Sequence, residues 1–118
     1  QVRDIPAHTT VSYGRTFETD GPARIAVVSI GYADGFLRTG SGKARVVING
    51  RSTPVLGRIC MDMCMARVPE GESVRRGDEV VVWGADTWTA EDAAAAAGTI
   101  SYEVVCGISR RVPRFYRG

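Results

Sequence analysis

Long hydrophobic runs are missing from this sequence of 118 residues. A helix needs about 20 consecutive apolar residues to cross a bilayer. The longest apolar runs here, residues 25–30 and 80–83, have the length of single strands. The first residues also lack a basic segment followed by an apolar one, which is the pattern of a secretory signal. We therefore expect neither export nor association with a membrane.

Cysteine and histidine are scarce. The three cysteines, Cys60, Cys64 and Cys106, are an odd number and cannot form a complete disulfide framework. Reduced thiols are typical of cytoplasmic proteins, and we expect that location. The single histidine, His8, lies far along the chain from the cysteines, whereas a structural zinc site needs four ligands. The sequence therefore predicts no metal site.

No charge of one sign dominates the chain, because 15 Lys or Arg residues face 13 Asp or Glu residues and the net charge is +2. Lysine is nearly absent, since Lys43 stands alone among fourteen arginines. Aromatic residues make up only 8% and are not interleaved with basic residues, which disfavours a nucleic-acid surface. Basic residues cluster only near the C-terminal end, at Arg110, Arg111, Arg114 and Arg117. That cluster can attract phosphates, but a solvated tail with structural salt bridges is the favoured interpretation.

The composition that remains is that of an ordinary globular protein, with 44% hydrophobic residues, and it suits one domain over residues 1–118. Asn49-Gly50 separates two strand-like runs and indicates a hairpin with a type I′ turn, whose two central residues both need a positive φ. The pattern predicts a mainly β fold, a small Greek-key-like barrel or sandwich. The expected strands are residues 24–30, 44–48, 51–55, 63–68 and 79–83.

One short α-helix is expected at about residues 89–97. Thr89 can cap its N-terminus, and Asp92 stands three residues later, as in a capping box. A run of alanines follows, and Gly98 supplies the C-terminal stop. The segment from residue 100 to residue 114 is predicted to be irregular or extended, and Val112, which precedes a proline, is expected to be extended.

Side chains capable of chemistry stand in four short segments, which contain Tyr13, Tyr32, Tyr102 and the run from Arg58 to Asp62. Each has an ordinary structural explanation when judged alone. A tyrosine often lies at the rim of a core with its hydroxyl bonded. A Gly-Tyr-Ala-Asp-Gly segment makes a turn in which Asp34 bonds the nearby backbone. A sulfur-rich segment packs well in a bulged strand. No single segment decides the function.

Read in order, however, six segments strongly resemble the C-terminal domain of alanine racemases. They are VSYGRTF at 11–17, IGYADG at 30–35, VLGRICMD at 55–62, GDEV at 77–80, GTISYE at 98–103 and GISRRVPR at 107–114. The resemblance covers nearly the whole chain, with the segments in the order and at the spacing of the family. Six ordered segments are far more specific than any one of them.

The resemblance implies an enzyme that racemises alanine with pyridoxal 5′-phosphate (PLP) and works as a homodimer. It implies an N-terminal (β/α)₈ barrel, not present here, which carries the PLP-binding lysine. By the same resemblance Tyr13 is the second acid/base residue and acts on L-alanine in the active site of the partner subunit. The Met61 backbone N–H binds the substrate carboxylate, and Tyr102 contacts the PLP phosphate. The residues that would line the substrate corridor are Tyr32, Arg38, Arg58, Asp62 and Ile100.

Two alternatives stay open from the sequence. A related racemase for serine or for a broad range of amino acids shares these motifs. A stand-alone β-barrel binding module, from another class of protein, is compatible with a small barrel. Lys43 follows a Gly-Ser-Gly loop, with no sign of the buried amine that covalent PLP binding requires. We therefore expect this chain alone to be inactive. The physiological role that the resemblance implies is D-alanine supply for peptidoglycan.

Overall fold

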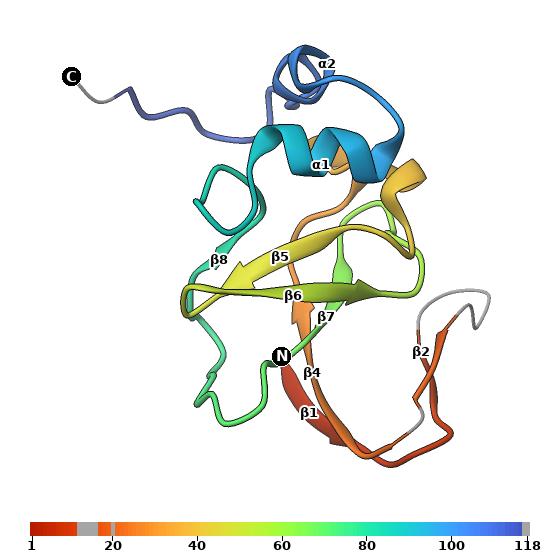
Figure 1. Cartoon of the computed structure of the whole chain (residues 1–118). Helices are drawn as coiled ribbons and strands as arrows, with labels where there is room; N and C mark the ends of the chain where they lie inside the picture. The colour runs from red at the N-terminus through yellow and green to blue at the C-terminus, as the bar shows by residue number, and fades with distance from the viewer. Residues whose placement is uncertain (12–16, 20, 117–118) are drawn as a thin grey trace.

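The computed structural model describes residues 1–11, 17–19 and 21–116, and most of its strands belong to one sheet (Figure 1). That sheet has six strands in the spatial order β1-β4-β7-β6-β5-β8, and every neighbouring pair is antiparallel. Two further strands, β2 (Thr10–Val11) and β3 (Phe17–Glu18), pair with each other. The six strands are β1 (Val2–Ile5), β4 (Ala23–Val28), β5 (Arg45–Ile48), β6 (Arg51–Leu56), β7 (Cys64–Arg67) and β8 (Val80–Val81).

The order of the strands confirms the prediction of a mainly β, Greek-key-like fold. Strands β5, β6 and β7 are consecutive neighbours, and β4, which precedes them, lies against β7. This is a Greek key traced in the reverse chain direction. The sheet is not closed, however, because β1 and β8 stand at its two ends. The word barrel therefore describes it only loosely.

The hairpin between β5 and β6 is confirmed at the predicted turn. Asn49 has φ 50° and Gly50 has φ 77°, so both central residues are left-handed, as a type I′ turn requires. The register pairs Ile48 with Arg51 directly across the turn. Because this turn matches the right-handed twist of the strands, it fixes which β5 side chains face the core.

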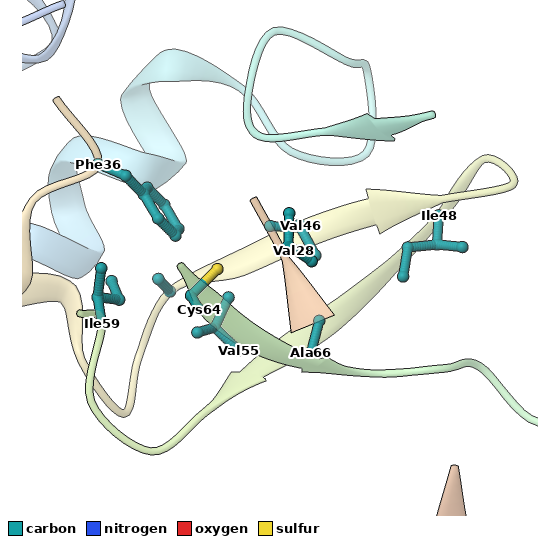
Figure 2. Close-up of a cluster of buried hydrophobic side chains, with 9 residues drawn as sticks. Val28, Phe36, Val46, Ile48, Val55, Ile59, Cys64 and Ala66 are labelled. Atoms are coloured by element: carbon teal, nitrogen blue, oxygen red, sulfur yellow. The ribbon is translucent and has the colours of Figure 1, made fainter. Parts of the chain in front are cut away.

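The main hydrophobic core lies between the sheet and the segments that cover it (Figure 2). Alternate residues of β7, Cys64 and Ala66, point into it, as expected for a strand with one buried face. Phe36 and Ile59 enter the same cluster from loops outside the sheet. The other members are Val28, Ala44, Val46, Ile48 and Val55. Loops that carry candidate site residues are therefore anchored by the core itself.

The helix predicted at about residues 89–97 is confirmed as α1 (Ala90–Ala97). The Thr89 hydroxyl accepts a hydrogen bond from the Asp92 N–H at 3.2 Å, and the Asp92 carboxylate accepts one from the Thr89 N–H at 2.9 Å. Gly98 ends the helix with φ 75°. Both hydrogen bonds of the capping box are thus formed. They satisfy two of the four backbone N–H groups that have no partner within the helix at its N-terminal end.

A second helix, α2 (Ser101–Cys106), was not expected, so the prediction of an irregular or extended segment is wrong for these residues. Six residues that include a Val-Val pair have weak helix propensity. The helix is stabilised instead by packing, since it lies against α1 and buries Val104 to 4% exposure. Neither helix in the described part of the chain has the length and apolarity to cross a membrane.

Cys64 gives the core a dependence on pH. Burial raises the pKa of its thiol from 9.0 to about 12, and the nearby Cys60 acts in the same direction. The thiol must stay neutral in the folded protein but ionises freely once unfolded, so stability is full below pH 9 and falls as the pH rises toward 12. Between pH 9 and 12 we expect the free energy of unfolding, measured with urea, to fall more steeply with pH than it does in Cys64→Ala. The difference between the two slopes should be at most about 1.4 kcal/mol per pH unit. Cys106→Ala, which alters an exposed thiol, should keep the original slope; equal slopes in all three proteins would contradict the prediction.

Candidate active-site surface

The predicted site residues that the structure describes all lie outside the sheet. Two 3-10 helices, η2 (Tyr32–Asp34) and η3 (Arg38–Gly40), and the loop between β6 and β7 carry most of them. The remaining two belong to the N-terminal end of α2. Tyr13 lies outside the described residues. In order, the described candidates are Tyr32 in η2, Arg38 in η3, Arg58, Met61 and Asp62 in the loop, Ile100 at the N-cap of α2 and Tyr102 within it.

Backbone hydrogen bonds join η2 to the loop of residues 60–62. The Tyr32 N–H donates to the Cys60 carbonyl at 2.9 Å, and the Ala33 N–H donates to the Met61 carbonyl at 3.0 Å. This contact needs Gly31, because a Cβ at that position would overlap the carbonyl oxygens of both Cys60 and Met61. The structure therefore brings together Tyr32, Met61 and Asp62, which are about thirty residues apart in the sequence.

The Met61 amide is an available hydrogen-bond donor. Its carbonyl accepts from Ala33, but within the described residues its own N–H donates no hydrogen bond. Met61 is 52% exposed and Tyr32 is 43% exposed, so both residues lie at the surface of the domain. A backbone N–H that has no partner among the described residues and is fixed by its neighbours can bind an anion such as a carboxylate.

Two ion pairs, whose acidic partners the sequence did not predict, connect the same two segments. Asp34 lies in η2 and Asp62 in the loop, and the Arg111 guanidinium contacts both carboxylates, at 2.8 Å and 3.1 Å. The predicted bond of Asp34 to nearby backbone is also formed, because its second oxygen accepts from the Gly31 N–H at 3.0 Å. For Arg111, the structural salt bridge was the correct interpretation of the C-terminal arginines.

Ser41 joins the segments that carry the two candidate corridor arginines. Its hydroxyl donates to the Arg38 carbonyl at 2.6 Å and accepts from the Ile59 N–H at 2.9 Å. Arg38 and Arg58 therefore belong to turns with a fixed relative position. The sequence offered a serine in a glycine-rich loop as the only sign of this contact.

Tyr102 and Ile100 reach the surface from α2. They are 78% and 63% exposed, the first by far the most exposed of the candidate tyrosines that the structure describes. The C-terminal end of α2 touches η2, since a Cβ at Gly35 would lie 2.5 Å from the Gly107 carbonyl oxygen. The helices and 3-10 turns consequently gather on one side of the sheet (Figure 1).

The chemistry available on this surface is acid–base and polar binding. Phenol hydroxyls, guanidinium groups, a carboxylate and the Met61 amide, which is unpaired among the described residues, are present together with exposed apolar side chains. In residues 1–11, 17–19 and 21–116, no three His, Cys, Asp or Glu side chains are grouped so that they could hold a metal ion. These residues lie on an open surface, whereas small-molecule sites are usually concave. The surface therefore suits one side of a site that another domain or subunit completes.

Comparison with known proteins identifies the domain. The family profile described as "Alanine racemase, C-terminal domain" matches residues 1–116. The chain belongs to this family. The expected resemblance is therefore confirmed over nearly the whole sequence.

Particular relatives agree with this assignment. The chain is 53% identical over 109 residues to alanine racemase 1 of Clostridium acetobutylicum, covering 90% of this chain and 28% of the relative. A solved structure from Clostridium difficile 630, alanine racemase in complex with cycloserine, is 44% identical with a TM-score of 0.90, covering 95% and 30%. The alanine racemase of Bartonella henselae with covalently bound pyridoxal phosphate is 34% identical with a TM-score of 0.93, covering 99% and 33%. The chain thus spans about a third of each relative's length.

Proposed function

We propose that this chain is the β domain of a PLP-dependent alanine racemase, an isomerase that interconverts L- and D-alanine for peptidoglycan. In this proposal the domain follows an N-terminal barrel, and two such subunits form a homodimer in the cytoplasm. The named alanine racemases support the activity, since they align with nearly the whole chain. The three free cysteines suit a reducing compartment.

The observation that carries the proposal is the loop of residues 60–62, in which Met61 and Asp62 are exposed. Its Met61 amide donates no hydrogen bond to any part of the chain that the structure describes, and backbone hydrogen bonds hold the loop against the Tyr32 turn. In the proposed site this N–H donates to the substrate carboxylate. An amide already fixed by its neighbours loses little conformational entropy when the substrate binds.

Tyr13 is the proposed acid/base residue on the L-alanine face. Its phenolate removes the α-proton of L-alanine, and its phenol returns a proton to the same face in the reverse direction. A free tyrosine titrates near about pH 10, so neighbouring positive charge must favour the phenolate. We assign those neighbours to the barrel domain. The assignment of Tyr13 rests on the motif at residues 11–17.

The described residues are suited to contact PLP from one side while another domain holds it. The exposed Tyr102 hydroxyl can donate to a phosphate that another domain holds. Lys43 is exposed in the turn after η3 and lacks the burial that a covalent PLP lysine needs. The isolated chain is therefore proposed neither to bind PLP covalently nor to racemise alanine. When bound, PLP supplies the electron sink for the charge left on Cα.

The remaining candidates form the proposed substrate corridor, contributed to the active site of the partner subunit. Arginines beside the entrance attract the carboxylate of an incoming amino acid. A corridor walled by large side chains restricts entry to small substrates. These residues are Tyr32, Arg38, Arg58, Asp62 and Ile100.

The test is racemisation by the full-length protein that contains this chain, supplied with PLP. L-alanine, D-alanine, L-serine and a larger amino acid such as L-leucine are assayed separately. We expect alanine to have the largest kcat/KM. Because enantiomers have equal free energy, the two directions must give equal kcat/KM and an equilibrium constant of about one.

The outcomes separate the alternatives. A kcat/KM larger for serine than for alanine would indicate the related serine racemase, and similar values for all substrates would indicate a broad-specificity enzyme. No racemisation of any amino acid by the PLP-loaded protein would refute the proposal and leave a binding module.

A further inference from the structure

Arg111 lies in the turn that follows α2, and it is the residue whose side chain contacts both segments of the proposed carboxylate site. Its Nε is 2.8 Å from the Asp34 Oδ1, and its Nη2 is 3.1 Å from the Asp62 Oδ1. One guanidinium thereby joins η2 to the loop of residues 60–62. The two carboxylates use different nitrogen atoms of the same planar group.

The Asp34 side of this contact is rigid. The Asp34 side chain is only 11% exposed, and its second oxygen accepts from the Gly31 N–H at 3.0 Å. The turn that carries Arg111 is also attached to η2, since the Ser109 N–H donates to the Asp34 carbonyl at 3.1 Å. Ser109 in turn accepts from the Arg111 N–H through its hydroxyl, at 3.2 Å. The Arg111 backbone and the Arg111 guanidinium are therefore both restrained, the first through Ser109 and the second by Asp34.

The Asp62 side is the more exposed one. The Asp62 side chain is 59% exposed and that of Arg111 is 54% exposed. Solvent screens such a pair, so its contribution to folding stability is small. Its effect is local: it restrains the residue next to Met61, whose amide is unpaired among the described residues. A restraint of this kind acts on binding geometry more than on the fold.

From these contacts we propose that Arg111 is a positioning residue for the reaction. It holds Asp62, and through it the Met61 amide, in the place where the substrate carboxylate binds. The inference rests on the proposed function and goes beyond it, since it assigns to a C-terminal arginine control of substrate binding. Lysine cannot replace it fully, because one ammonium is a point charge without the two-sided fork of a guanidinium.

The test uses the full-length, PLP-loaded protein with Arg111→Ala, Arg111→Lys and the control Arg110→Ala. Arg110 is the exposed neighbour of Arg111 in the same turn. For Arg111→Ala we expect kcat/KM for L-alanine to fall by about tenfold, the size of one charged hydrogen bond. Most of the loss should appear as a higher KM, because the carboxylate contact is made in both ground and transition states. Arg111→Lys should recover part of the loss, and Arg110→Ala should stay within about twofold of the wild type.

A double-mutant cycle tests the route through Asp62. In an Asp62→Asn background, Arg111→Ala should cost less than about threefold in kcat/KM, because the partner it acts through has already been changed. Thermal unfolding is measured for every variant. Arg111→Ala leaves the mostly buried Asp34 carboxylate without its guanidinium and should melt below Arg110→Ala, but it should remain fully folded at the assay temperature.

The inference is overturned by any of three results. The first is a kcat/KM for Arg111→Ala that is no lower than that for Arg110→Ala, and the second is an effect of Arg111→Ala that is unchanged in the Asp62→Asn background. The third is an unfolded fraction of Arg111→Ala at the assay temperature that accounts for its whole loss of activity. If the unmodified protein racemises no amino acid, the proposed function fails first and this inference with it. If the unmodified protein racemises alanine and one of the three results is found, only the role of Arg111 fails.

Discussion

Tyr13→Phe in the full-length protein is expected to abolish exchange of the α-hydrogen of L-alanine while D-alanine still exchanges. The substitution keeps the aromatic ring and removes only the hydroxyl that is proposed to take the proton. A positioned acid/base group contributes about 10² to 10⁴ in rate, so the loss on the L-alanine face should lie in that range. Each enantiomer is incubated separately in deuterated water, and the loss of its α-hydrogen signal is followed by NMR.

Tyr116→Phe is the matched control, since it removes a hydroxyl from a tyrosine that is 89% exposed near the end of the described chain. Its exchange rates should match those of the unmodified protein for both enantiomers. Wild-type exchange from L-alanine in Tyr13→Phe would show that this tyrosine is structural. Equal loss from both enantiomers would show instead that the hydroxyl is needed for binding rather than for one face of the reaction.

Local signals predicted most of the fold correctly. The Asn49-Gly50 turn has two left-handed residues, and Thr89 and Asp92 form the capping box. In both places the residues that decide the conformation are neighbours in the sequence, so their chemistry suffices. The strand expected at residues 63–68 is found as β7, Cys64–Arg67, with alternate residues buried.

Features that depend on distant contacts were not predictable in the same way. Helix α2 is short and weak in propensity, and it forms where it can pack against α1 and bury Val104. Whether the sheet closes is decided by how the edge strands β1 and β8 are placed in space, and they remain apart in the strand order. Strand count and turn spacing carry no information about that closure.

In the candidate site, too, sequence motifs identified residues but did not predict contacts between distant parts of the chain. The sequence motifs name Tyr32, Met61 and Asp62 through a family resemblance, and the structure places these three in joined segments. It does not follow from the motifs that Arg111 contacts Asp62 across 49 residues of sequence. A sequence shows how many charges there are, whereas the fold decides which of them meet.

Gly31 is the residue on which the joined segments most depend. Its φ is −149°, an extended conformation that any residue can adopt, so left-handed backbone is not the reason for a glycine. The reason is space, because a Cβ there would overlap the carbonyl oxygens of Cys60 and Met61. Both obstacles are backbone atoms, which cannot move aside as the end of a flexible side chain does.

Gly31→Ala is therefore expected to force η2 away from the loop of residues 60–62. The hydrogen bonds from Tyr32 to Cys60 and from Ala33 to Met61 should lengthen or break. Overpacking typically costs about 1–3 kcal/mol, and the displaced Met61 amide should lower kcat/KM for alanine by about a hundredfold. Urea unfolding and steady-state racemisation of the full-length protein measure the two effects.

Gly21→Ala is the control variant. It separates the steric overlap expected at Gly31 from the general effect of replacing a glycine by alanine. A Cβ at Gly21 would have nothing within 4 Å, and that residue precedes β4 whereas η2 follows the other end of that strand. It should leave racemisation unchanged and alter stability by less than about 1 kcal/mol. If Gly31→Ala behaves like Gly21→Ala, the close contact between η2 and the loop is not needed for activity. If Gly31→Ala loses activity while Arg111→Ala does not, the backbone contact alone positions the Met61 amide.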